Sequence, residues 1–271
     1  EHLRSPNIPH EIVVWGTAID LTVKTQGVFN LVFHPHGWIR NDQVVELIDR
    51  VVKTHGTKVK FLSFRECQDR LNRFLLAGQP LRATDGGDNG VRLIDVNNDG
   101  FMDVVIGNDE ARQTWVWVPD NQGWLQAARR DGASFPAQLV TVQEGGQRTK
   151  TGLQFGVLSP DGEASVLFRD ESRSGAWRFD GSGWVAEPRF LAGLEIDGEP
   201  VLTLRAGKDN GVRLRDLDGD GLCEAVVGNP RQSAVFRYDL STNRWERLPF
   251  TLPPGTAIVR ESGGDAGLRF V

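Results

Sequence analysis

Two nine-residue stretches carry oxygen-bearing side chains at alternate positions. The first runs from Asp95 to Asp103 (DVNNDGFMD, loop 1) and the second from Asp216 to Glu224 (DLDGDGLCE, loop 2). Both place Asp, Asn or Glu at positions 1, 3, 5 and 9, and glycine at position 6. Ca²⁺ takes about six to eight oxygen ligands, and a glycine with positive φ permits the sharp turn that lets alternate side chains converge. The pattern therefore predicts two calcium sites.

The predicted ligands are the acidic and amide side chains of each loop, together with the backbone carbonyl at position 7. They are Asp95, Asn97, Asp99, Phe101 (backbone) and Asp103 in loop 1, and Asp216, Asp218, Asp220, Leu222 (backbone) and Glu224 in loop 2. The alternative is an ion-free turn, because Asp, Asn and Gly dominate turns in general. Two copies with the same spacing favour the calcium interpretation.

The residues around the loops exclude one familiar calcium motif. An EF-hand needs a bidentate Glu at position 12 and flanking helices, whereas position 12 is Ile106 in loop 1 and Val227 in loop 2. Short β-branched runs that end in Gly-Asn flank both loops, and such runs are typical of strands. The sequence predicts a strand, loop and strand unit.

The loops belong to a longer repeat. Its anchor glycines are Gly90, Gly152, Gly211 and Gly267, at steps of 62, 59 and 56 residues. Hairpin turns and a Trp-bearing last strand predict four strands in each unit. We expect the aromatic residues to pack between sheets rather than to form a ligand platform. The middle unit has a shorter, acid-poor stretch (157–163), which predicts a turn without metal.

Residues from about 85 onward resemble FG-GAP/VCBS repeats, the type also found in integrin α-subunit heads. The motif is met at 95–107 and, with Glu224 in place of the final Asp, at 216–228. The resemblance implies structural calcium and an incomplete β-propeller of four-stranded blades, because family propellers have about seven blades. We therefore expect the chain to be cut at its C-terminus. The implied blades are 84–150, 151–207, 208–262 and the start of a fourth at 263–271.

The first part of the chain is different in kind. Its pattern is helix, strand, helix, strand, helix, which indicates an α/β domain with parallel strands. A stretch this short cannot cover both faces of a parallel sheet, so residues 1–83 are expected to be the end of a larger domain. The expected helices are 13–26, 44–52 and one that opens near Ser63, and the expected strands are 28–33 and 58–64.

This part resembles the C-terminal portion of NodB-type polysaccharide deacetylases, which have a distorted (β/α) barrel. The residues that carry the resemblance are 31–36 and 59–66. It implies that His34 assists the reaction, while a divalent metal such as Zn²⁺ activates water. The family's metal-binding motifs are absent and would lie upstream, so we expect an internal piece of a longer protein that is inactive by itself.

Other interpretations of the histidines remain open. His34 and His36 are two residues apart, so on an extended segment they face the same side and form a possible metal pair. They also fit a plain packed strand end. A loop that follows a buried strand is where α/β barrels place their active sites, which favours a functional role.

Composition limits the function further. The net charge of −5, with no basic stripe, argues against nucleic-acid binding. No apolar stretch is long enough to predict a membrane span. Weak calcium loops fill where calcium is near millimolar, which predicts an extracellular, periplasmic or cell-surface location. Two functions stay open: a deacetylase-like, carbohydrate-active protein, or a calcium-dependent adhesion module. Either would bind a glycan or protein through the propeller face, with the missing blades and upstream barrel as further partners.

Overall fold

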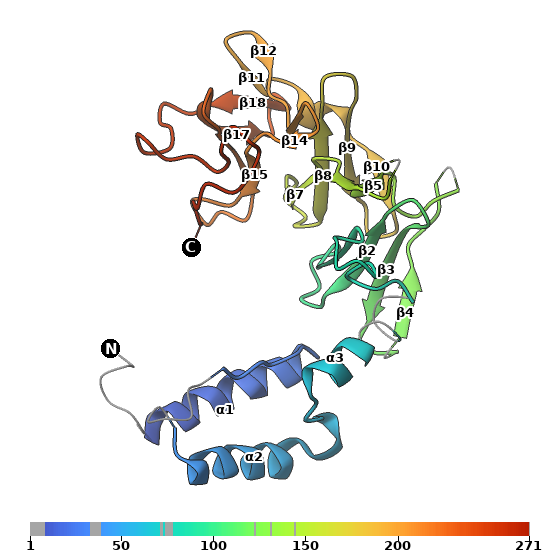
Figure 1. The fold of residues 1–271 in the computed structure, drawn as a ribbon, viewed down its shortest axis with the longest axis vertical. Coiled ribbons are helices and arrows are strands. Elements are labelled where there is room, and N and C mark those ends of the chain that lie inside the picture. The colour runs from blue at the N-terminus through green and yellow to red at the C-terminus, as the bar shows by residue number, and fades with distance from the viewer. Residues whose placement is uncertain are drawn as a thin grey trace. The chain divides into compact units, whose positions relative to one another are not determined.

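The computed structural model describes residues 9–32, 39–70, 73, 78–121, 123–130, 132–143 and 145–270. The chain divides into two compact units, Glu1–Arg70 and Leu71–Val271. We call them the helical unit and the β unit and describe each by itself (Figure 1).

The helical unit is built on two helices that pack against each other. They are α1 (Pro9–Lys24) and α2 (Asn41–His55), and a short α3 (Phe64–Arg70) follows a 3-10 turn. Ile19 of α1 meets Leu47 and Val51 of α2 in a small apolar cluster. Asp20 ties the pair at its edge, since it binds Arg50 and lies 2.6 Å from His55 Nε2.

The expected barrel portion is wrong for the described part of this unit. Segments 27–32 and 59–63 form no strand, and Val28, Val32 and Phe61 are 66%, 76% and 57% exposed. A parallel strand must be covered on both faces. Here α1 and α2 bury their apolar faces on each other, so neither apolar run has a sheet to join.

The expected helix positions are confirmed. Helices occupy most of 13–26 and all of 44–52, and the third begins just after Ser63. The Ser63 hydroxyl accepts a hydrogen bond from the Glu66 N–H (3.3 Å), and the Glu66 carboxylate accepts one from the Ser63 N–H (2.9 Å). This reciprocal pair satisfies two N–H groups at the start of the helix.

The described part of the β unit contains three four-stranded antiparallel sheets (Figure 1). Within each sheet the strands are neighbours in sequence order, so short hairpins suffice to connect them. Sheet 1 is β1 (Val91–Ile94), β2 (Asp103–Gly107), β3 (Arg112–Val118) and β4 (Gly123–Gln126); sheet 2 is β7 (Gln154–Val157), β8 (Ala164–Arg169), β9 (Ser174–Phe179) and β10 (Trp184–Ala186); sheet 3 is β15 (Val212–Arg215), β16 (Glu224–Gly228), β17 (Ser233–Asp239) and β18 (Arg244–Arg247).

Two-stranded hairpins accompany these sheets. They are β5 (Val140–Val142) with β6 (Arg148–Lys150), β11 (Glu195–Ile196) with β12 (Glu199–Pro200), and β13 (Leu204–Arg205) with β14 (Lys208–Asp209). The β5–β6 hairpin precedes sheet 2, and the other two precede sheet 3.

Strand register is equivalent in the three sheets. Ile94 pairs with Asp103 and Arg215 with Glu224, and at the same place in sheet 2 Gly156 pairs with Ser165. In sheet 2 one further pair, Val157 with Ala164, limits the connection to 158–163, so the middle loop is shorter than 95–102 and 216–223 in the other sheets, as predicted. The repeated glycines have a steric reason: Gly90 has φ +65°, and a Cβ there would lie 2.5 Å from the Gly107 carbonyl oxygen.

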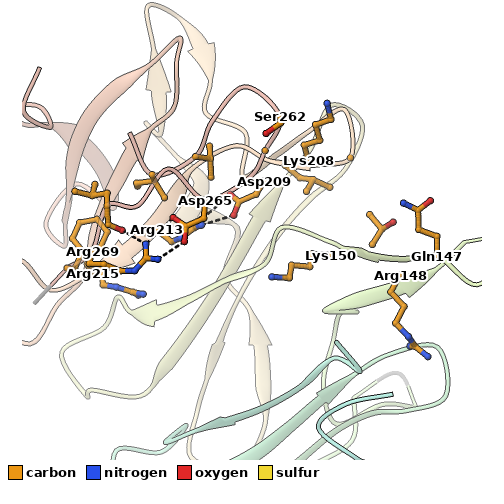
Figure 2. Close-up of a pocket in the computed structure, with 18 residues that line it drawn as sticks. Gln147, Arg148, Lys150, Lys208, Asp209, Arg213, Arg215, Ser262, Asp265 and Arg269 are labelled. Carbon is orange, nitrogen blue, oxygen red and sulfur yellow. Dashed lines mark hydrogen bonds and ion pairs between the residues drawn. The ribbon is translucent and has the colours of Figure 1, made fainter. Parts of the chain in front are cut away.

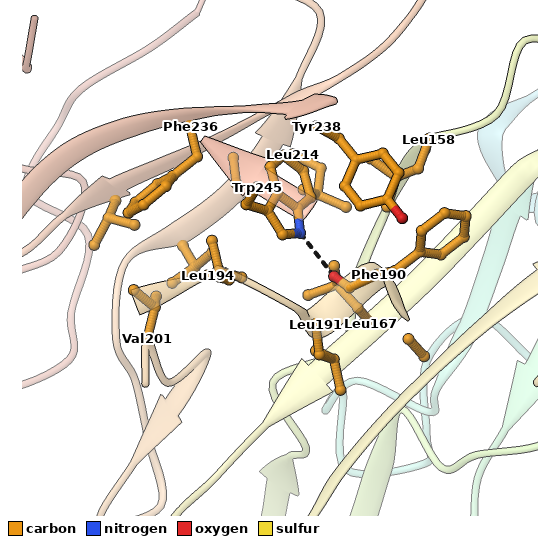
Figure 3. Packing of buried hydrophobic residues seen from close by; sticks show 14 of the residues in the cluster. Leu158, Leu167, Phe190, Leu191, Leu194, Val201, Leu214, Phe236, Tyr238 and Trp245 are labelled. Carbon is orange, nitrogen blue, oxygen red and sulfur yellow. Dashed lines mark hydrogen bonds between the residues drawn. The ribbon is translucent and has the colours of Figure 1, made fainter. Parts of the chain in front are cut away.

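Large side chains fill the space between neighbouring sheets. Between sheets 2 and 3, Leu167, Leu214 and Phe236 pack with the ring of Trp245, whose Nε1 donates to the Phe190 carbonyl at 2.7 Å (Figure 3). Between sheets 1 and 2, Trp184 takes the corresponding place and is 4% exposed. These two tryptophans confirm the expected packing role.

The predicted propeller is also wrong. The three sheets close into neither a barrel nor a propeller, and residues 263–270, expected to begin a fourth blade, form no strand beyond a single bridge between Asp265 and Val259. A ring of such blades needs about four or more. The outer face of sheet 3 is instead covered by Leu252, Ile258 and Leu268 from the chain that follows.

Candidate metal centre

Loop 2 brings carboxylates from both of its ends to one point. Asp216, Asp218 and Glu224 each offer an oxygen, and these oxygens lie within 4.8 Å of one another. Glu224 is the first residue of β16 and is 2% exposed, whereas Asp216 and Asp218 are exposed. Oxygen donors on a curled loop, one of them anchored in a sheet, suit a hard divalent cation.

Backbone N–H groups orient these carboxylates. Asp216 accepts hydrogen bonds from the Gly219 and Gly221 N–H groups at 2.7 and 3.0 Å. Glu224 accepts one from the Leu217 N–H at 2.9 Å, and Asp220 accepts one from the Leu222 N–H at 2.8 Å. The loop is therefore curled by its own acidic side chains.

Loop 1 repeats this network. Asp95 accepts from the Gly100 N–H at 2.9 Å, Asp99 from the Phe101 N–H at 2.8 Å, and Asp103 from the Val96 N–H at 2.8 Å. Each bond has a counterpart at the same position in loop 2. The two loops thus share a backbone arrangement as well as a sequence pattern.

Asp103 is the most perturbed group in loop 1. Its side chain is fully buried, and its second oxygen accepts a hydrogen bond from the Trp117 N–H at 2.8 Å. Burial raises the pKa of Asp103 to about 6; the two backbone donors oppose this rise, and the carboxylates of Asp99 and Asp95 add to it. A divalent cation between these acids would relieve the cost of ionising Asp103.

A second feature of loop 1 also fits a cation. The Oδ1 atom of Asn97 is buried and has no hydrogen-bond partner within the described part of the chain, while its Nδ2 donates to Asp99 at 2.9 Å. An unpaired buried acceptor costs about 1–3 kcal/mol. A metal ion is one partner that such an oxygen can take, so the residues present fit calcium.

The loops differ in one neighbour that the sequence analysis missed. In loop 2, Arg237 of β17 binds Asp218, and its Nε lies 3.3 Å from Glu224 Oε1. Glu224 and then Asp218 raise the pKa of this guanidinium. The register of β3 against β2 places Val116 at the equivalent position beside loop 1. The sequence did contain a signal for this contact, because an arginine lies on the strand that pairs with the strand bearing the final acid of the loop.

Not every predicted calcium ligand belongs to the carboxylate cluster. Asp220 lies outside the three-carboxylate cluster of loop 2. The carbonyls of Phe101 and Leu222 stay predictions. In the middle loop, Val157 and Ser165 stand where loops 1 and 2 have their first and last acids, so that loop lacks the end ligands.

His34 and His36 fall within 33–38, which lies outside the described residues. The strand expected to lead into His34 is absent from 27–32. A catalytic or metal-binding role for either histidine stays a prediction.

Comparisons with known proteins add no assignment. No family model matches the sequence, and no curated protein matches it significantly. Both family resemblances therefore stay predictions based on short motifs. Among the described helices, none is both long and apolar enough to cross a membrane.

Proposed function

We propose that the β unit is a calcium-stabilised binding module that works outside the cytosol. The observation that carries this proposal is the convergence of Asp216, Asp218 and Glu224 within 4.8 Å on a loop whose backbone arrangement loop 1 repeats. Exposed loops of this kind bind calcium weakly and fill where it is near millimolar. That setting corresponds to an extracellular, periplasmic or cell-surface protein.

The position of the loops gives bound ions a structural role. Both connect the first two strands of a sheet, and each contacts the middle loop. Val96 of loop 1 accepts a hydrogen bond from the Ala164 N–H at 2.9 Å, and Cys223 of loop 2 donates one to the Val157 carbonyl at 2.8 Å. An ion that rigidifies either loop also rigidifies its junction with sheet 2, which stabilises the stacked sheets.

Support for catalysis is weaker. The deacetylase interpretation depended on a barrel portion, and the described helical unit contains no strand. The acids of both loops are used as hydrogen-bond acceptors within the loops. We therefore propose binding, not hydrolysis, as the role of the β unit.

Calcium titration by calorimetry tests the proposal. We expect two bound Ca²⁺ ions in the wild type, one in Asp99→Ala and one in Asp220→Ala, because Asp99 and Asp220 are the predicted ligands at position 5 of the two loops. Mg²⁺ should compete poorly, since it demands a rigid octahedral site. Absence of binding by the wild-type protein at millimolar calcium would contradict the proposal.

A further inference from the structure

A cavity of about 660 Å³ lies within the β unit, and its lining includes no carboxylate of loop 1 or loop 2. It is bounded by β6, by the turn between β13 and β14, by β15 and by the segment 258–270 (Figure 2). Cavities that hold small ligands are about 300–1,000 Å³. The space is therefore large enough for a ligand of one to a few sugar rings.

The charge of this cavity is opposite to that of the whole chain. Six Lys and Arg side chains and two Asp side chains line it, which leaves an excess of four positive charges in a protein of net charge −5. Both carboxylates are already neutralised, because Asp209 pairs with Arg213 and Asp265 with Arg269, each at 2.6 Å. Lys150, Lys208 and Arg215 form no ion pair with any described residue.

The repeat shows that Lys150 is a local departure from the pattern. Arginine pairs with the aspartate four residues before it in three places: Asp88 with Arg92, Asp209 with Arg213, and Asp265 with Arg269. Measured from Gly152, the anchor glycine of the middle unit, the same two positions are Lys150 and Gln154. The aspartate has been replaced by a cation, and its arginine by a neutral amide. Figure 2 shows the amino group of Lys150 on the side that faces Arg213 and Arg215.

The neighbouring cations are held in place. The Arg215 guanidinium lies 5.9 Å from the centre of the Phe270 ring and donates to the Leu214 carbonyl at 2.7 Å. Gly263 has φ +81°, and a Cβ there would lie 2.8 Å from the Lys208 Cβ. The glycine thus lets the Lys208 stem pass close to the 258–270 segment. Pre-positioned cations lose less freedom when a ligand binds.

We propose that this cavity binds an acidic oligosaccharide, whose carboxylate or sulfate groups pair with Lys150, Lys208 and Arg215. Five apolar residues line it: Leu204, Ile258 and Val259 are 7%, 5% and 2% exposed, whereas Leu268 and Phe270 are half-buried. The remaining accessible lining is charged and hydroxyl- or amide-bearing, which suits the hydroxyl groups of a sugar frame. This inference names the class of ligand for the proposed binding module. It rests on the proposed function only in taking the β unit to be a binding module.

The test is calorimetric titration with four probes at low ionic strength. A heparin-derived tetrasaccharide carries sulfates, trigalacturonate carries only carboxylates, maltotetraose is neutral, and hexa-aspartate is an acidic peptide. We expect one or both acidic saccharides to bind, the neutral one not to bind, and the peptide to bind more weakly. Which acidic saccharide binds better identifies the anionic group. Added salt should weaken binding, because the interacting charges are exposed.

Matched variants locate the site. Lys150→Gln/Lys208→Gln removes two cavity cations, and Lys58→Gln/Lys60→Gln removes two exposed lysines of the helical unit. Loss of two charge-assisted contacts should weaken acidic-saccharide binding by about tenfold or more in the first variant, with no change in the control. All four lysines are exposed, so both variants should fold; Arg215→Gln provides an independent check.

Three results would overturn the inference: no binding of either acidic saccharide, equal or tighter binding of hexa-aspartate, or equal loss of affinity in the two double variants. Titrations are run both with calcium and with EDTA. If the protein binds saccharide but no calcium, the cavity assignment holds and the calcium proposal is wrong. If it binds calcium but no acidic saccharide, the calcium proposal holds and the cavity assignment is wrong.

Discussion

Loops 1 and 2 share nine positions and a hydrogen-bond network, yet they balance their negative charge differently. In loop 1 the final acid, Asp103, is fully buried beside the uncharged Val116. In loop 2 the final acid, Glu224, lies against the guanidinium of Arg237. The repeated sequence sets the positions of the acids in each loop. The residue on the third strand of each sheet determines whether a positive charge compensates their negative charge.

This difference predicts unequal dependence on calcium. Arg237 supplies loop 2 with a cation of its own, so a metal ion there must compete with an existing ion pair. Loop 1 has no such partner within the described residues and keeps the unpaired Asn97 oxygen as well. We therefore expect loop 1 to bind calcium more tightly and to gain more stability from it.

The largest expected effect follows from Asp103→Ala. This change leaves the N–H groups of Val96 and Trp117 without their acceptor inside the sheet. The loss of this acceptor for both N–H groups should cost about 2–5 kcal/mol of unfolding free energy. Urea unfolding in EDTA measures this without any contribution from calcium.

The matched variant is Asp103→Asn, which keeps an oxygen acceptor but no charge. Its amide oxygen can replace only one of the two acceptors of Asp103, so it should unfold between the wild type and Asp103→Ala in EDTA and lose the calcium response of loop 1. If Asp103→Ala unfolds like the wild type, the buried hydrogen bonds of Asp103 are not stabilising the sheet.

The next effect concerns Arg237→Gln. Removal of the guanidinium leaves Asp218 and Glu224 uncompensated, so loop 2 should bind calcium about tenfold more tightly, which corresponds to about 1.4 kcal/mol. Titration in an Asp99→Ala background isolates loop 2. Arg244→Gln, an exposed arginine on β18 of the same sheet, is the control for net charge. Weaker calcium binding by Arg237→Gln would reverse our view that the arginine competes with the ion.

A smaller effect is the pH dependence of loop 1. Because the pKa of Asp103 is raised to about 6, its contribution to the metal-free fold is present at low pH and is lost as pH rises through about 6. Calcium must displace a proton below that pH. In an Asp220→Ala background, calcium affinity should therefore be several-fold weaker at about pH 5 than at about pH 7. A constant affinity across this range would mean that Asp103 is not a ligand.

The sequence predicted the local features well. Acid spacing and flanking strands located both loops, and hairpin turns predicted four strands in each unit. The expected helix start near Ser63 was also correct, and in the structure Ser63 and Glu66 form a capping pair there. All of these depend on residues that are close together in the chain.

Features that depend on distant partners could not be predicted in the same way. The apolar run at 28–33 looked like a buried strand, but a parallel strand exists only if other strands lie beside it. Arg237 is thirteen residues from Glu224, and only the register of β16 against β17 shows that they meet. The number of sheets, and hence the closure of a ring, likewise depends on packing between neighbouring sheets.

The central claim is that calcium in these loops stabilises the β unit, and thermal unfolding in calcium and in EDTA tests it most directly. Ions that bind only the folded form should add about 2.7 kcal/mol per site at a hundredfold excess over Kd. We predict a higher Tm in calcium for the wild type and no shift for Asp99→Ala/Asp220→Ala. A wild-type Tm that is the same in calcium and in EDTA would contradict the account and leave both loops as ion-free turns.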